Sequence, residues 1–127
     1  MIGDGWQMLL VGAGVTLHEA LKAAAQLDAA GVKVSVMDPF TIKPIDQEAL
    51  VREARRCGGR VLTVEDHYPE GGLGEAVCAA LADQRDVVVK RLAVDRVPRS
   101  GPPDVLLDLF GINARAIVAA AKQLATL

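Results

Sequence analysis

The feature that most constrains the fold is a regular alternation of short apolar runs with longer segments of helical period. The apolar runs are Gln7–Val11, Lys33–Met37, Arg60–Val64 and Val87–Val94. Such alternation is typical of βαβ units built around a parallel sheet. The runs are nearly continuous rather than alternating, which favours strands that are covered on both faces. We therefore expect an α/β domain with helices on both sides of the sheet.

Glycine and capping residues predict where the helices begin and end. After the first strand, the turn Gly12–Gly14 leads into a helix that Thr16 should cap, with Glu19 completing a Thr-x-x-Glu capping box. Its expected buried stripe is Leu17, Leu21, Ala24 and Leu27, and Gly31 should end it in the left-handed region. The dipeptide Asp38-Pro39 then predicts extended backbone.

Four further helices are expected downstream. Asp46 should cap a helix whose buried face is Leu50, Val51, Ala54 and Cys57, and Gly58-Gly59 should end it. An alanine-rich helix is expected from about Gly74 to Ala82. A short helix should open at Pro102-Pro103-Asp104 and end at Phe110-Gly111, and Asn113 should cap the last helix, with Ile112 and Ile117 as a hydrophobic staple.

Length and composition restrict the classes of protein that fit. With 127 residues, we expect a single domain spanning 1–127, in which 1–6 is an irregular N-terminal segment. The net charge of -2 and the 3% aromatic content argue against nucleic-acid binding, because neither a basic stripe nor a stacking platform is present. The apolar runs are far shorter than the roughly 20 residues that cross a bilayer. Cys57 and Cys78 lack metal-ligand spacing and are expected to be free thiols in a reducing cytoplasm.

Four motifs, in order along the chain, carry a resemblance to a known family. They are Gly12-Ala13-Gly14-Val15-Thr16-Leu17-His18-Glu19-Ala20, Asp38-Pro39-Phe40-Thr41-Ile42-Lys43-Pro44, Glu65-Asp66-His67-Tyr68 and Val97-Pro98-Arg99-Ser100-Gly101. Together they resemble the C-terminal domain of animal-type transketolases, over about Gln7 to Leu124. The resemblance implies a three-layer α/β/α sandwich with a mostly parallel sheet and one antiparallel strand.

The same resemblance implies where the chemistry of the parent enzyme lies. Transketolases of the pentose phosphate pathway move two-carbon ketol units between sugar phosphates, using thiamine diphosphate and a divalent metal, Mg or Ca, held by the first two domains of a dimer. The expected partners of this chain are those domains and a second subunit. No catalytic, cofactor-binding or metal-binding residue of the family maps onto this sequence, and Gly3-Asp4-Gly5 matches the metal motif only by accident.

The candidate site lies where the strands end. In a parallel sheet these turns gather at one edge, so Gly12–Gly14, Asp38–Phe40 and Glu65–Glu70 should be neighbours. Gly12 and Gly14 precede a helix whose N–H groups could bind an anion, although the rest of a dinucleotide fingerprint is missing. Gly71-Gly72-Leu73-Gly74 lacks the ending of a phosphate loop and predicts a flexible turn.

Ionisable residues supply the remaining candidates. Asp66, His67 and Glu70, close to Glu65, could serve in proton transfer or metal binding, but their spacing matches no standard metal site. His67 is more simply interpreted as a hydrogen-bonded loop residue than as a ligand or base. His18 is expected on an exposed helix face. Arg96 and Arg99 could bind a phosphate, or could pair with a carboxylate of a neighbouring domain.

Three hypotheses about function follow. The first is a structural and assembly domain, with a possible regulatory role, that is not catalytic by itself. The alternatives are a stand-alone module that binds anions or nucleotides and one half of a split transketolase. The resemblance implies a strand before Gln7, and we expect Met1–Trp6 to be too short and glycine-rich to form it, so an altered sheet edge should favour self-association.

Overall fold

The computed structural model describes residues 5–38, 47–65, 72–93 and 111–126. The strands are β1 (Met8–Gly12), β2 (Val34–Met37), β3 (Arg60–Val64) and β4 (Val88–Leu92), and the helices are α1 (Val15–Ala29), α2 (Gln47–Arg56), α3 (Leu73–Leu81) and α5 (Ala114–Leu124). Within the described ranges the strands form one sheet in the order β2-β1-β3-β4, and every pair is parallel. The predicted α/β class is confirmed.

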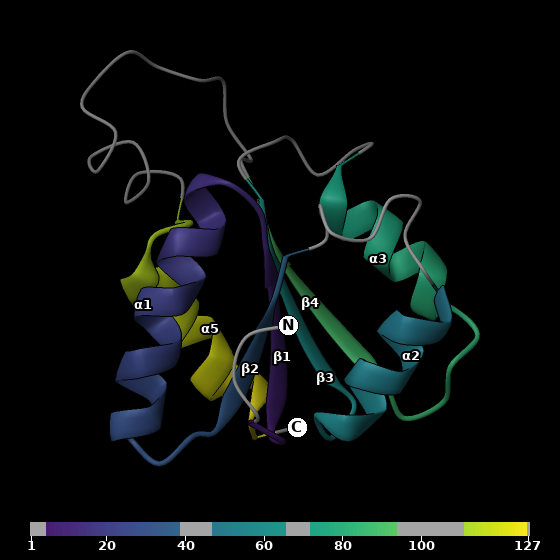
Figure 1. The fold of residues 1–127 in the computed structure, drawn as a ribbon, viewed down its shortest axis with the longest axis horizontal. Coiled ribbons are helices and arrows are strands. Elements are labelled where there is room, and N and C mark those ends of the chain that lie inside the picture. Colours follow the sequence, from purple (N-terminus) through teal and green to yellow (C-terminus); the bar gives the residue numbers. More distant parts are fainter. Residues whose placement is uncertain (1–4, 39–46, 66–71, 94–110, 127) are drawn as a thin grey trace.

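The helices cover the sheet on both faces, as Figure 1 shows, with α1 and α5 on one side and α2 and α3 on the other. Each side has its own apolar core. The α1/α5 core is centred on Met8, Leu10 and Leu62, and the α2/α3 core is centred on Leu9, Val11 and Val61. Neighbouring strand residues thus point to opposite cores, which is why β1 is buried along its whole length. The result is the expected three-layer sandwich.

The predicted start of α1 is wrong. The helix begins at Val15 with Gly14 in the capping position, so Thr16 lies inside its first turn. The Thr16 hydroxyl instead accepts a hydrogen bond from Ala13 N at 3.0 Å and donates one to Ala13 O at 2.8 Å. A Thr16–Glu19 capping box therefore does not form. The buried stripe is also rotated, because Ala20, Ala23 and Leu27 are buried whereas Leu17, Leu21 and Ala24 are half-buried.

Other predicted boundaries hold. Gly31, Gly58 and Gly59 have φ values of 86°, 72° and 75°, so each helix or turn ends in the left-handed region that glycine tolerates. Leu50, Val51, Ala54 and Cys57 all belong to the α2/α3 core. Asn113 caps α5 by accepting a hydrogen bond from Ala116 N at 3.0 Å. Ile112 and Ile117 are both buried in the α1/α5 core, as a hydrophobic staple requires.

Some expectations fall outside the described residues. They are the Asp46 cap, the extended backbone at Pro39 and the short helix that should end at Phe110. The antiparallel strand implied by the resemblance does not occur in the four described ranges, where all pairings are parallel. Cys57 is buried, Cys78 is half-buried, and both are free thiols, as expected. Among the described helices, none has the length and apolar character to cross a membrane.

Candidate functional site

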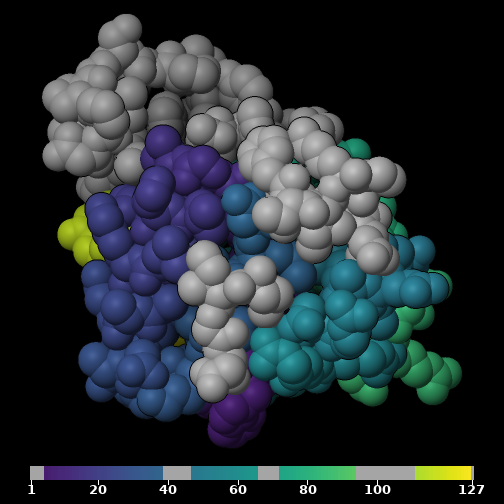
Figure 2. Space-filling model, viewed as in Figure 1, coloured from purple at the N-terminus to yellow at the C-terminus, as the bar shows by residue number. Residues whose placement is uncertain are grey.

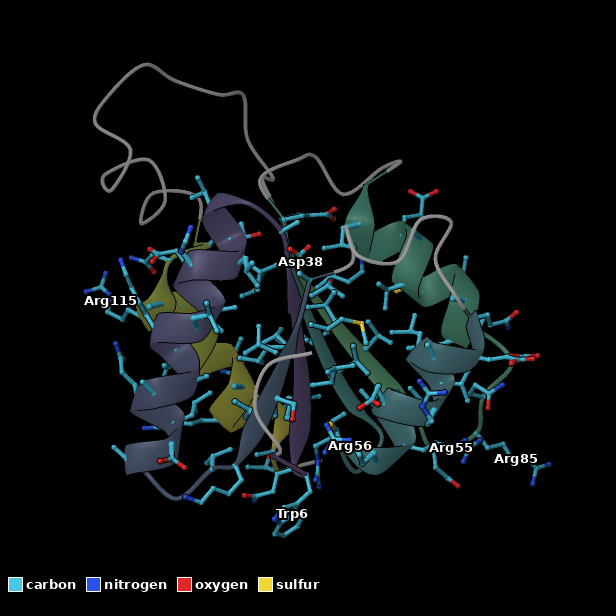
Figure 3. All side chains as sticks on the ribbon, in the orientation of Figure 1. Trp6, Asp38, Arg55, Arg56, Arg85 and Arg115 are labelled. Atoms are coloured by element: carbon cyan, nitrogen blue, oxygen red, sulfur yellow. The ribbon has the colours of Figure 1, made fainter. Side chains whose placement is uncertain are left out.

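The carboxyl ends of the strands form one edge of the sheet, which we call the carboxyl edge. The register pairs Val11 with Met37 and Gly12 with Val64, so the residues that follow each strand are neighbours. Gly12, Asp38 and Glu65 therefore lie together at this edge, and Figure 3 labels Asp38 there. Asp66, His67, Glu70, Arg96 and Arg99 belong to the candidate set but lie outside the described residues.

The Gly12–Gly14 turn is tightly closed. A side chain at Gly12 would approach Thr16 O to 2.9 Å, because the first turn of α1 packs directly on the end of β1. Gly14 has φ 59° and ψ -124°, a conformation that residues with a side chain rarely adopt. Both glycines are thus explained by backbone geometry.

Several of the N–H groups that were predicted to face an anion are engaged inside this turn. Thr16 N donates to Ala13 O at 3.2 Å, Leu17 N donates to Gly14 O at 3.1 Å, and Ala13 N donates to the Thr16 hydroxyl. A helix N-terminus binds an anion through unsatisfied donors. Ala13 N, Thr16 N and Leu17 N are engaged within the turn itself, which lowers its capacity for a phosphate.

Glu65 is the most unusual residue at the carboxyl edge, because its carboxylate is almost completely buried, with 2% of its surface exposed. Its Oε2 accepts a hydrogen bond from Gly74 N at 3.1 Å, in the first turn of α3. The capping position of α3 is Gly72, which has no side chain to offer. Glu65 therefore supplies, from the end of β3, the acceptor and negative charge that stabilise a helix N-terminus.

Two glycines make room for this carboxylate. A Cβ at Gly72 would collide with Glu65 Oε2, and a Cβ at Gly74 would lie 2.7 Å from Arg91 Nε and 3.0 Å from Thr63 Oγ1. Gly72 and Gly74 thus allow α3 to approach Glu65 closely without displacing its side chain or that of Arg91. The sequence-based interpretation of this segment as a flexible turn missed that constraint.

Arg91 and Thr63 complete the surroundings of Glu65. Arg91 Nη2 lies 4.0 Å from Glu65 Oε1, which is an ion pair at its outer limit and too long for a hydrogen bond. Within the part of the chain that the structure describes, Glu65 Oε1 and the Thr63 hydroxyl have no hydrogen-bond partner. Sequence analysis singled out neither Thr63 nor Arg91. The available signals were a polar residue inside the buried strand β3 and two cations, Lys90 and Arg91, inside β4.

The other groups offer little chemistry. Burial raises the pKa of the Cys57 thiol above its ordinary value, and the nearby Arg56 charge only partly offsets that effect. Cys57 is thus protonated at neutral pH and is a poor nucleophile. No group of three His, Cys, Asp or Glu side chains suited to a metal ion occurs among the described residues. His18 is exposed on α1, as expected.

One open hollow of about 340 Å³ lies on the outside of the α2/α3 layer, lined by Gln47, Glu48, Val51, Arg52 and Gln84. No residue that the sequence singled out as a site candidate lines it.

The described residues at the carboxyl edge do not fit a diphosphate and its metal. The turn at Gly12–Gly14 is bonded internally, and the Glu65 carboxylate is hydrogen-bonded to α3.

Comparison with known proteins identifies relatives of the whole domain. The family described as "Transketolase, C-terminal domain" matches residues 1–117. The chain is 56% identical over 117 residues to Transketolase-like protein 2 of Mus musculus, which covers 92% of this chain and 19% of that protein. It is 52% identical over 120 residues to Transketolase of Homo sapiens, covering 94% of this chain and 19% of that protein. The chain thus spans about a fifth of the length of these curated relatives.

Solved structures agree with this comparison. A structure described as a split gene transketolase in an inactive beta4 tetramer superimposes with a TM-score of 0.89 and 38% identity, covering 98% of this chain and 41% of that chain. Transketolase from Leishmania mexicana gives a TM-score of 0.67 with 20% identity, covering 95% of this chain and 16% of that chain. The second likeness concerns the fold alone.

Proposed function

The chain belongs to the transketolase C-terminal domain family, and from this membership we propose that it is the structural and assembly domain of a transketolase. In this role it packs against the other domains of the enzyme and contributes to the contact between subunits. It does not transfer ketol units by itself. Thiamine diphosphate and its metal are bound by the other domains of the enzyme.

One observation supports the proposal above all others. Glu65, the carboxylate best placed for chemistry at the carboxyl edge, is buried and hydrogen-bonded to Gly74 N, so it joins β3 to α3. A catalytic carboxylate must reach the proton that it transfers, whereas this one is held inside the domain. Glu65 thus stabilises the packing of α3 on the sheet.

A complementation assay tests this function. A relative truncated before its C-terminal domain supplies the remaining domains, and ketol transfer from a ketose phosphate to an aldose phosphate is measured with thiamine diphosphate and Mg²⁺. We expect no transfer by the chain alone, and a higher rate when the chain is added to the truncated relative. The matched control is the chain with Glu65→Ala, which should fold less stably and complement less well. Transfer by the chain alone would overturn the proposal.

A second candidate is one component of a split transketolase. It is favoured by the likeness to the split gene transketolase structure, which covers 98% of this chain. In this case a separate partner chain supplies the cofactor site. Copurification of the chain with such a partner, followed by activity of the mixture and not of either part, distinguishes the two candidates.

A third candidate, a stand-alone binder of anions or nucleotides, is disfavoured by the internal hydrogen bonds of the Gly12–Gly14 turn. Titration calorimetry with inorganic phosphate and with ATP tests it. We expect no saturable heat with either ligand.

A further inference from the structure

Two buried oxygen atoms at the carboxyl edge have no hydrogen-bond partner among the described residues. They are Glu65 Oε1 and Thr63 Oγ1, and their residues are 2% and 0% exposed. The other carboxylate oxygen, Glu65 Oε2, accepts its hydrogen bond from Gly74 N. A buried polar atom without a partner is costly, and such atoms in folded proteins are nearly always bonded to protein or to ordered water. Two of them in one place therefore point to a bound group.

The side chains of Thr63, Glu65 and Arg91 lie on one face of the sheet. Residues alternate between the two faces of a strand, and Val61, two positions before Thr63, packs in the α2/α3 core. Glu65 N donates to Leu92 O at 2.9 Å, so the pairing of β3 with β4 continues through Glu65, and Arg91 is the direct partner of Thr63. All three side chains thus belong to the face that α3 covers, near the end at which α3 begins (Figure 1).

The polar atoms of these side chains converge on Gly74, in the first turn of α3. A Cβ built on Gly74 would lie 2.7 Å from Arg91 Nε and 3.0 Å from both Glu65 Oε1 and Thr63 Oγ1. These are hydrogen-bond distances, so the three atoms surround one small space beside the Gly74 backbone. Arg91 Nη2 and Glu65 Oε1 are 4.0 Å apart. Polar groups at such a distance are often bridged by a water molecule.

The charges around this space determine what it binds. Glu65 is an anion and Arg91 is a cation, so a bound anion would be repelled by the first and a bound metal ion by the second. Glu65 Oε1 can only accept a hydrogen bond, the Arg91 guanidinium can only donate one, and the Thr63 hydroxyl can do either. A water molecule has two hydrogen atoms and two lone pairs, and it carries no charge. Water therefore matches both the charges and the hydrogen-bonding groups of the set.

We propose that a single buried water molecule binds beside Gly74 and bridges Thr63 Oγ1, Glu65 Oε1 and the Arg91 guanidinium. It donates to Glu65, accepts from Arg91 and exchanges a third hydrogen bond with Thr63. Buried waters typically make about three hydrogen bonds, which is the number that this set supplies. The bridge joins β3, β4 and the start of α3, in addition to the direct hydrogen bond from Gly74 N to Glu65. The inference concerns the interior of the domain, so it is independent of the assembly role proposed above.

A high-resolution crystal structure of the 127-residue chain tests the proposal directly. We expect an ordered water oxygen within about 3.2 Å of both Thr63 Oγ1 and Glu65 Oε1. Thr63→Val replaces the hydroxyl by a methyl group of similar shape and should remove this water, whereas Thr63→Ser keeps the hydroxyl and should retain it. A direct hydrogen bond between Thr63 and Glu65 with no water between them, or an ion at this position, would overturn the inference.

The sign of the stability change gives a second test. If the Thr63 hydroxyl binds the water, Thr63→Val should lower the Tm by about 4 °C, because a buried hydrogen bond is lost. A buried hydroxyl without any partner is destabilising, so in that case Thr63→Val would leave the Tm unchanged or raise it, which would contradict the proposal. Thr16→Val is the matched control, because the Thr16 hydroxyl is 1% exposed and makes two direct hydrogen bonds to Ala13. It should lower the Tm by a similar amount.

Oxygen-17 relaxation dispersion of the solvent tests the same water in solution, because it counts waters that stay bound for longer than the tumbling time of the protein. Thr63→Val should lower this count by one, and Thr63→Ser should leave it unchanged. The hollow beside α2 does not interfere, since it is open, and Figure 2 shows α2, in teal, at the surface of the domain. Waters there exchange too fast to be counted. Equal counts for the parent and Thr63→Val would overturn the inference, provided that circular dichroism shows both to be folded.

Discussion

The two edges of the sheet use glycine in different ways. At the carboxyl edge, Gly72 and Gly74 make room for side-chain atoms, mainly those of Glu65 and Arg91. At the opposite edge, where the amino ends of the parallel strands lie, Gly5 and Gly59 make room for backbone, namely Val34 and the carbonyl oxygen of Asp86. A side chain can rotate away from an added methyl group, whereas paired backbone cannot. The structure can therefore relax less around a methyl group added at Gly5 or Gly59 than around one added at Gly72 or Gly74.

The largest expected effect tests how little the backbone around Gly59 can relax. Gly59→Ala should lower the free energy of unfolding by about 3 kcal/mol, since it combines a left-handed conformation with a collision against Asp86 O. Gly31→Ala is the matched control, because Gly31 has φ 86° but nothing within 4 Å of its Cβ position. It should cost only about 1 kcal/mol. Urea unfolding measures both, and equal losses would show that backbone packing at Gly59 contributes nothing.

The second prediction concerns the buried carboxylate. Glu65→Ala should lower the free energy of unfolding by about 2 kcal/mol, because Gly74 N loses its acceptor in a buried position. Glu65→Gln keeps an acceptor oxygen and should lose less. Glu75→Ala, which removes an exposed carboxylate from the first turn of the same helix, is the control and should cost less than Glu65→Ala, because no buried donor loses its acceptor. A Glu75 effect as large as that of Glu65 would contradict the assigned role.

A third prediction compares a distant helix cap with a local one. The α3 N-terminus depends on Glu65, from another element, whereas α5 is capped by its own Asn113. Asn113→Ala should cost about 1 kcal/mol, and Asn113→Asp should be nearly neutral, since aspartate caps equally well. Thermal unfolding of the three chains measures this, and a loss in Asn113→Asp as large as in Asn113→Ala would argue against capping.

The smallest effect is the pH dependence that Cys57 contributes. Burial raises the pKa of this thiol in the folded chain, so folding favours its protonated form. The resulting stability is complete below the unfolded pKa, about 8.5, and is lost as the pH rises through the folded value. We expect Cys57→Ala to flatten the decline in stability above about pH 8.5. If the free energy of unfolding falls with pH equally in the parent and in Cys57→Ala, Cys57 does not contribute to the loss of stability at alkaline pH.

Much of the fold was predictable because it depends on short-range patterns. Strand β3 was expected at Arg60–Val64 and is found there, since it lies between a glycine pair and a polar loop. The Asn113 cap and the ends at Gly31 and Gly58-Gly59 were predictable for the same reason. The α1 start was not, because Thr16 could bond either forwards to Glu19 or backwards to Ala13, and the packing of Gly12 against the helix selected the second.

The candidate site was less predictable. Gly12 and Gly14 were singled out as candidates for an anion site, whereas the structure explains both by backbone geometry, and Ala13 N, Thr16 N and Leu17 N are bonded within the turn. Glu65 was noticed only as a member of an ionisable cluster, and Thr63 and Arg91 were not noticed. Their contact depends on strands β3 and β4 being adjacent, which no local pattern reveals.

The sequence alone determined the class of the domain, the order of its strands and helices along the chain, and its likeness to the transketolase C-terminal domain. These features depend on periodicity, caps and motifs that act over a few residues. The tertiary structure decided that Glu65 is a buried helix cap and that the carbonyl oxygen of Gly5 accepts a hydrogen bond from Arg56 at the end of α2. Both depend on groups that are distant in the chain, which only the packing of helices on a parallel sheet brings within hydrogen-bond distance.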